Sequence, residues 1–207
     1  MSGKKKILRW SLGAIAALTV ALVVVRCSNA HAYNRTLPSL RERVGEALKY
    51  CRARGLSTEY CILVDFGIPS GRRRMFVWDF KRDTVKYASL CAHGYGRGST
   101  ASKPVFSNVP GSYCSSPGHY KTGIRSYSQY GIHIHYKLHG LDGSNSNAFD
   151  RSIVLHSFDP VPEVEIFPAY LPLGYSQGCP VISNDVMRSV DALLRNSQKP
   201  LLLWIYE

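Results

Sequence analysis

Apolar side chains recur in this 207-residue chain with two different periods, and each period predicts its own kind of element. After the capping box Ser39–Glu42, a spacing of three and four residues predicts an amphipathic helix that ends near Gly55. Its apolar face consists of Leu40, Val44, Ala47, Leu48 and Cys51. The same spacing returns behind Ser183, an N-cap residue, and predicts a second helix that ends near Asn196.

Short runs rich in β-branched and aromatic residues predict strands between these helices. The runs are Ile62–Phe66, Met75–Phe80, Val85–Cys91, Gly131–Leu138, Ser152–His156 and Leu201–Tyr206. Turn-forming clusters separate the first three, which predicts a meander. Because strand-like runs outnumber helical ones, we expect a mainly β domain with a few helices, of the α+β class. Residues 94–130 and 139–150 lack periodicity, and loops of that length usually form a site.

The start of the chain has a charge pattern of its own. Lys4–Lys6 and Arg9 precede an uncharged run, Trp10–Val25, and the segment Ala30–Ala32 reads Ala-His-Ala. A basic start, an apolar stretch and a small-x-small site are typical of an export signal. With the Arg9 side chain extended to the membrane surface, the apolar stretch covers residues 7–25, so an uncleaved membrane anchor is the alternative.

The excess of basic over acidic residues limits the classes of partner that this chain is expected to bind. Lys and Arg number 26 against 14 Asp and Glu, a net charge of +12, and five of the basic residues lie in the first 32 positions. This balance suits nucleic acid, anionic lipid or an anionic wall polymer, and export argues against the first. The densest basic run, Arg72–Arg74 behind Gly71, is expected to be a solvated turn.

Cysteine usage separates one thiol from the others. Five cysteines follow the export signal, and an odd number in an exported protein leaves at least one thiol free. Cys179 is the natural odd one. Cys51 with Cys61 and Cys91 with Cys114 are plausible disulfides, although four cysteines allow three pairings and the sequence does not choose among them.

The surroundings of Cys179 indicate how this thiol reacts. It lies in the segment Gly-Tyr-Ser-Gln-Gly-Cys-Pro, and a thiol becomes a nucleophile only with a base or cation nearby. His156 ends an apolar, strand-like run, where catalytic side chains gather. Gly178 permits a sharp turn in which the amides of Gln177, Gly178 and Cys179 are expected to bind an oxyanion. A buried, inert thiol is the alternative.

The motif around this cysteine resembles a known signature. Ser176-x-Gly178-Cys179, preceded by Ile153-Val154-Leu155-His156, is similar to the signature of the murein L,D-transpeptidase catalytic-domain family. Further matches in the same order are His93-Gly94, Phe106-Ser107-Asn108, Gly118-x-Tyr120, Gly140-Leu141-Asp142, Asn145-x-Asn147-Ala148 with Arg151, and Gly178-Cys179-Pro180. The resemblance covers roughly residues 60 to 207 and points to a Gly-Cys-Pro branch of the family.

The resemblance implies a fold and a set of site residues. An L,D-transpeptidase-like β-sandwich or barrel is expected over residues 60–207, behind a helical extension at residues 33–59 and the export signal at 1–32. Cys179 is implied as the nucleophile and His156 as its base, in a site that also includes Gly178, Gln177 and the backbone of Ser157. Substrate contacts are expected from His93, Asn108, His133 and Ser176.

The resemblance also implies a reaction. The thiolate attacks the carbonyl of the third stem-peptide residue of peptidoglycan, expels the terminal D-alanine and passes the acyl group to an amine. With Gln177 before the Gly-Cys pair and Pro180–Val181 after it, where the commoner pattern has histidine and a basic or amide residue, hydrolysis is the obvious variant. Pairing with a His156 imidazolium is expected to hold the thiol pKa below its ordinary value of about 8.5.

Three further patterns in the sequence also have simpler structural interpretations. His133 and His135 lie two apart on a predicted strand and, with His139, are the residues of an alternative zinc site, but carboxylate partners are missing. Gly94–Gly98 resembles a phosphate loop, yet no Walker lysine follows. Five tyrosines are expected to stack on sugars or peptide, or to pack in the core: Tyr113, Tyr120, Tyr127, Tyr130 and Tyr136.

The sequence therefore predicts a cysteine acyltransferase that acts on peptidoglycan stem peptides in the periplasm or cell envelope, with no cofactor, no metal and no nucleic-acid partner. A membrane contact is expected only through the N-terminal segment, if it stays uncleaved. The alternatives are a catalytically inactive wall-binding module and a zinc hydrolase centred on His133 and His135.

Overall fold

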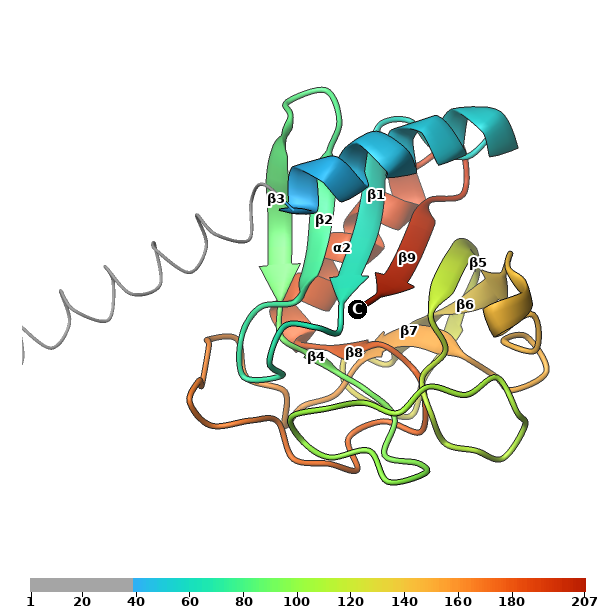
Figure 1. Ribbon diagram of the computed structural model, residues 1–207. Coiled ribbons are helices and arrows are strands. Elements are labelled where there is room, and N and C mark those ends of the chain that lie inside the picture. The colour runs from blue at the N-terminus through green and yellow to red at the C-terminus, as the bar shows by residue number, and fades with distance from the viewer. Residues whose placement is uncertain (1–38) are drawn as a thin grey trace, which may run out of the picture. The chain divides into compact units, whose positions relative to one another are not determined.

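The computed structural model describes residues 39–207, and the predicted export signal lies outside this range (Figure 1). Residues Ala47–Glu207 form one compact unit. Residues 39–54 are helical, which confirms the first predicted helix. Gly55 ends it with a φ of +67°, and the Leu56 amide donates to the Cys51 carbonyl at 3.0 Å, a Schellman-type cap. Among the described residues, no helix is long and apolar enough to cross a membrane.

Nine strands of the described chain form a single sheet in the order β3-β2-β1-β9-β5-β6-β7-β8-β4. They are β1 (Tyr60–Asp65), β2 (Met75–Asp79), β3 (Thr84–Ser89), β4 (Cys91–Ala92), β5 (Gly118–Tyr127), β6 (Ile134–Gly140), β7 (Val154–Ser157), β8 (Val181–Ile182) and β9 (Leu202–Tyr206). A 3-10 turn, η1, covers Gly143–Asn145, and helix α2 covers Asn184–Asn196. The expected mainly β class with few helices is confirmed.

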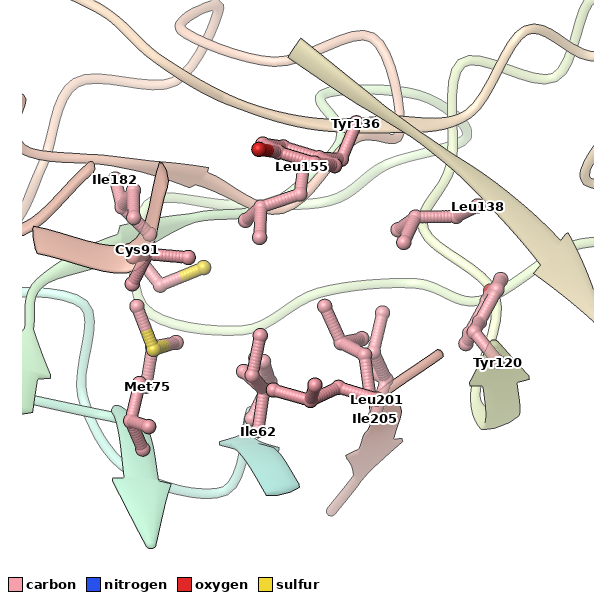
Figure 2. Close-up of a cluster of buried hydrophobic side chains, with 14 of the residues drawn as sticks. Ile62, Met75, Cys91, Tyr120, Tyr136, Leu138, Leu155, Ile182, Leu201 and Ile205 are labelled. Carbon is pink, nitrogen blue, oxygen red and sulfur yellow. The ribbon is translucent and has the colours of Figure 1, made fainter. Parts of the chain in front are cut away.

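The sheet curls until its two halves face each other, so it is nearly closed. Figure 2 shows side chains of β1, β2 and β9, such as Ile62 and Met75, facing those of β6, β7 and β8, such as Leu155 and Ile182, across the core. Helix α2 adds Met187, Val190 and Leu194 to the same cluster. Strand β1 is buried along its centre, as expected of a strand covered on both faces.

The apolar periodicity of the sequence did not predict one long strand. Strand β5 lies inside the stretch 94–130 that the sequence predicts as loop, and it pairs with both β9 and β6. Only Tyr120 and Thr122 of its ten residues are buried, and its second half is largely exposed. Strand β6 begins at Ile134 rather than at the predicted Gly131, because His133 adopts a positive φ of 61°.

All five cysteines in the described chain are free, so the disulfides expected of the first four are wrong for this structure. The Cys91 thiol approaches the Ala92 carbonyl at 3.6 Å, and the Cys114 thiol approaches the Ser112 carbonyl at 3.4 Å. Burial raises the pKa of Cys51 to about 11 and that of Cys91 to about 12. These thiols therefore behave as small core residues rather than as cross-links or nucleophiles.

A charged network fastens α2 to the sheet. Asp191 accepts hydrogen bonds from Arg125 of β5 at 2.7 Å and from the Tyr136 hydroxyl of β6 at 2.7 Å. Burial by itself raises the pKa of Asp191, but the hydrogen bonds from Arg125 and Tyr136 outweigh it, so the pKa lies below the ordinary aspartate value. A carboxyl with a lowered pKa stabilises the folded state at neutral pH.

Replacing Asp191 by Asn should lower the free energy of unfolding at pH 7 by about 1–3 kcal/mol, because the charge-assisted hydrogen bonds from Arg125 and Tyr136 are weakened. The wild-type contribution is complete above about pH 4 and is lost as the pH falls through the lowered folded-state pKa. Urea unfolding at pH 7 and pH 3 measures both effects. Asp185→Asn, at an exposed pair on the same helix, should change stability by less than about 1 kcal/mol; equal losses in the two variants would contradict this account.

Candidate active site

The sheet brings Cys179 and His156 to one place. Strands β7 and β8 run parallel with His156 opposite Val181, so Cys179 lies two residues before the partner of His156. Both side chains line a cavity of about 660 Å³. Two parallel strands need a long connection between them. Here the connection is residues 158–180, and its last residues form the turn with Cys179, next to the strand that contains His156.

The Cys179 thiol contacts the backbone at the start of β7. Its sulfur accepts a hydrogen bond from the Val154 amide at 3.4 Å and lies 3.9 Å from the Ser152 carbonyl oxygen, toward which the thiol donates. Burial raises the pKa of Cys179, and the Val154 amide and the charges of Arg151 and Lys137 offset part of this increase. The same amide and cations would stabilise a thiolate formed during a reaction.

Hydrogen bonding fixes the orientation and the tautomer of His156. Its Nδ1 lies 2.9 Å from the Ser157 carbonyl oxygen. A carbonyl only accepts, so Nδ1 carries the proton and Nε2 is left as the basic nitrogen. Burial lowers the pKa of His156, the Ser157 carbonyl opposes this, and His135, opposite it on β6, lowers the pKa further.

These pKa shifts correct one expectation from the sequence. A thiol pKa below the ordinary value is predicted from an imidazolium partner, but burial moves both groups toward their neutral forms. The pair therefore rests as neutral Cys179 and neutral His156 at pH 7. In a neutral pair of this kind, the proton would pass to Nε2 as the sulfur attacks, which is general-base catalysis.

The turn before Cys179 is closed by a serine. The Ser176 hydroxyl accepts from the Gly178 amide at 2.9 Å and donates to the Cys179 carbonyl at 2.6 Å. Gly178 has a φ of +119°, and a Cβ there would lie 2.7 Å from the Cys114 carbonyl oxygen. Only glycine fits this position. The Gly178 amide, expected to bind an oxyanion, is occupied by Ser176, whereas Gln177 is exposed on the cavity wall.

Arg151 is a cavity residue that the sequence shows only as part of the family pattern. Its guanidinium donates to the Ser107 carbonyl at 2.9 Å and to the Cys114 carbonyl, and so ties the segment 107–116 to the floor of the site. It is the lone Lys or Arg among the lining residues, and no Asp or Glu lines the cavity. The site therefore has positive potential beside the thiol.

Comparison with known proteins identifies the domain. A family model for the L,D-transpeptidase catalytic domain matches residues 37–206. The chain belongs to the L,D-transpeptidase catalytic-domain family. The match begins ahead of the helix at 39–54, so it includes most of the segment that the sequence assigns to a separate extension. Membership supports a peptidoglycan L,D-transpeptidase-like role.

Solved structures give more distant likenesses. The helical cell shape determining protein Pgp2 from Campylobacter jejuni is 11% identical with a TM-score of 0.47, over 72% of this chain and 47% of that one. An L,D-transpeptidase from Xylanimonas cellulosilytica is 12% identical with a TM-score of 0.38, over 71% of this chain and 60% of that one. The chain thus spans about half to three fifths of these proteins. Curated protein sequences give no match.

Two predicted substrate contacts of this L,D-transpeptidase domain lie outside the cavity lining. His93 is buried and receives a hydrogen bond from Arg74 at 2.7 Å on Nδ1, with Nε2 on the Thr100 carbonyl. Arg74, predicted in a solvated turn, is fully buried and also donates to the Cys91 carbonyl, so it is a core residue. Asn108 holds the loop after β6 through the Asn147 amide and the Gly143 carbonyl.

The other two predicted contacts differ from each other. Ser176 lines the cavity, although its hydroxyl is engaged in the turn. His133 is exposed, stacks on Tyr127 and approaches the Ser128 carbonyl at 3.2 Å, while its neighbour His135 lines the cavity instead. Of the five tyrosines expected to stack on a ligand or to pack in the core, Tyr113, Tyr127 and Tyr130 line the cavity, and Tyr120 and Tyr136 are core residues. Tyr175 also lines the cavity, but it lies in a loop without periodicity and was not predicted as a contact.

The alternative zinc site gains no support from the geometry. His133 stacks on Tyr127, His135 faces the cavity, and His139 stacks on Phe149 at 5.1 Å. The three imidazoles thus have separate surroundings. Within residues 39–207, no group of three or more His, Cys, Asp and Glu is arranged to hold a metal ion.

Gly178→Ala should sharply reduce alkylation of Cys179 by iodoacetamide, because the new Cβ meets the Cys114 carbonyl and displaces the turn. Gly174→Ala is the matched control. Gly174 also has a positive φ, of 108°, but nothing lies within 4 Å of a Cβ placed there, so only backbone strain of about 1–2 kcal/mol is added. Similar alkylation rates in the two variants would show that the close approach does not position the thiol.

Proposed function

We propose that this domain is a cysteine acyltransferase or peptidase of the L,D-transpeptidase type, with Cys179 as nucleophile and His156 as general base. The single observation that carries this proposal is that one cavity is lined by both side chains, with Nδ1 of the imidazole held by the Ser157 carbonyl. The substrate class is the stem peptide of peptidoglycan, in keeping with the family.

In the first step, the Cys179 sulfur attacks the carbonyl carbon of the third stem residue while Nε2 of His156 takes the thiol proton. The negative charge moves to the carbonyl oxygen. Among the described residues, the amides of Gln177 and Cys179 donate no hydrogen bond to the protein, and they are the groups we assign to this oxygen. Collapse breaks the C–N bond, and the imidazolium returns the proton to the departing amine of D-alanine.

In the second step, the thioester on Cys179 is attacked by an acceptor. An amine of another stem gives a cross-link, and water gives an L,D-carboxypeptidase product. His156 removes a proton from the acceptor and returns it to the sulfur, which restores the resting pair. The aromatic wall of Tyr130, Phe158 and Tyr175 beside the imidazole limits the access of bulk water to it.

The location of the reaction is part of the same proposal. The basic start and apolar run of the first 32 residues favour export to the periplasm or cell envelope, with residues 7–25 as an anchor if the signal stays uncleaved.

The charge of the site also fits the proposed substrate, because a positive cavity suits the carboxylates of the stem peptide.

Cys179→Ala should abolish both the acyl-enzyme and turnover of a disaccharide-tetrapeptide, followed by mass spectrometry. His156→Ala should leave a folded protein whose turnover is lower by a factor of about 10² to 10⁴, the loss typical of a missing general base. The control is His133→Ala, which removes an exposed imidazole outside the cavity lining and should keep near-normal turnover. Turnover unchanged in His156→Ala would remove this residue from the mechanism, and a folded wild type that binds peptidoglycan without acylation would favour the inactive wall-binding module.

The acid limb of the pH profile of kcat/KM should lie below pH 6.5. The base must be neutral, and the pKa of His156 is lowered by burial, so its neutral form persists to lower pH than that of an exposed histidine. The thiol pKa is raised, so the basic limb should lie above about pH 8.5. Steady-state kinetics from pH 4 to pH 10 tests this, and an acid limb above pH 7 would contradict the neutral resting pair.

A further inference from the structure

The glycine-rich run Gly94–Gly98 packs against a second loop, at residues 111–115, backbone against backbone. The Gly96 amide donates to the Tyr113 carbonyl at 3.0 Å, and the Gly94 amide donates to the Ser115 hydroxyl at 3.0 Å. A Cβ at Gly96 would overlap the Ser112 carbonyl oxygen, and one at Gly94 would overlap the Tyr113 carbonyl. The glycines therefore serve close packing of two loops, not phosphate binding.

This packing places two exposed tyrosines side by side. The rings of Tyr95 and Tyr113 stack at 5.2 Å with an interplanar angle of 15°, and the residues are 37% and 45% exposed. Tyr113 has a φ of +55°, so the surrounding loop holds its backbone in a conformation that few non-glycine residues adopt. A pair of exposed rings fixed in this way is pre-organised to bind a flat partner.

The tyrosine pair is joined directly to the catalytic turn. The Tyr95 amide donates to the Ser176 carbonyl at 3.1 Å, and Tyr113 lines the same cavity as Cys179. Other aromatic residues of the cavity lining pack against protein side chains. Tyr130 and Tyr175 both pack edge-on against Phe158, beside His156. The pair Tyr95–Tyr113 thus borders the cavity as a separate surface.

We infer that Tyr95 and Tyr113 form a saccharide subsite that binds a pyranose ring of the glycan to which the stem peptide is attached. This inference rests on the proposed function. The C–H face of a pyranose carries slight positive charge and matches the negative face of a tyrosine ring, while the hydroxyl tips and the neighbouring Gly111 backbone offer hydrogen bonds. No carboxylate lines the cavity, so the chemistry of the border suits a neutral sugar and not a cationic group.

The test compares two substrates of the full-length chain, a disaccharide-tetrapeptide and the same tetrapeptide without its sugars. Wild type should show a kcat/KM about 3- to 10-fold higher for the sugar-bearing substrate, the gain expected of one stacked ring. Tyr113→Ala should remove this preference, so that the kcat/KM values for the two substrates become equal, while Tyr113→Phe should keep it. Alanine and tyrosine share the strain of the positive φ, so the comparison isolates the ring.

Tyr170→Ala is the matched control, because Tyr170 is 38% exposed and lies outside the cavity lining. It should keep the preference. Equal kcat/KM for both substrates in wild type, or an equal loss on both in Tyr113→Ala, would overturn the subsite.

A binding measurement separates this inference from the proposed function. The disaccharide N-acetylglucosaminyl-N-acetylmuramic acid is titrated into the Cys179→Ala variant by NMR, with and without Tyr113→Ala. Binding that Tyr113→Ala weakens supports the subsite even if neither substrate acylates Cys179, an outcome that would defeat the proposed function alone. Absence of disaccharide binding would overturn the subsite whatever the turnover.

Discussion

The parallel pairing of β7 with β8 is the constraint on which the site depends. Each contributes only two hydrogen-bonded positions, His156 with Val181 and Ser157 with Ile182, yet this register decides where Cys179 lies. Leu155 and Ile182 anchor the two strands in the core, facing β1 and β2 (Figure 2). Helix α2 begins directly after β8, so its packing also holds the short strand in place. A pairing this small is stable only because its neighbours fix both partners.

Around that pairing, the loops are held by backbone contacts that require glycine. Gly178 approaches the Cys114 carbonyl, and Gly94 and Gly96 approach the carbonyls of Tyr113 and Ser112. Arg151 completes the assembly by donating to the Cys114 carbonyl, the same group that Gly178 approaches. The loop from 107 to 116 thus supports the Cys179 turn and the tyrosine pair together, although it has no apolar periodicity.

The sequence predicts those features that follow from apolar periodicity or from a motif. Such features are helix α2, the first three strands, and the choice of Cys179 and His156 as candidate site residues. Strand β5 was not predicted, because it pairs with β9 and β6 through backbone hydrogen bonds while its side chains are mostly polar. His93 was misplaced for a different reason. Its role depends on Arg74, a buried cation that no local pattern distinguishes from its exposed neighbour Arg73.

Burial in the cavity also explains how Cys179, the proposed nucleophile, is kept in its neutral form. Desolvation raises the pKa of Cys179 and lowers that of His156, so the resting pair carries no charge. A protonated thiol is a poor target for oxidants, which matters in the oxidising compartment proposed for this domain. Under the proposed mechanism, activation requires a substrate whose carbonyl carbon is attacked by the sulfur as Nε2 takes the proton. In that mechanism, the Val154 amide and the Arg151 charge would stabilise the anionic sulfur, so the same cavity that keeps the thiol neutral at rest would support its charge during attack.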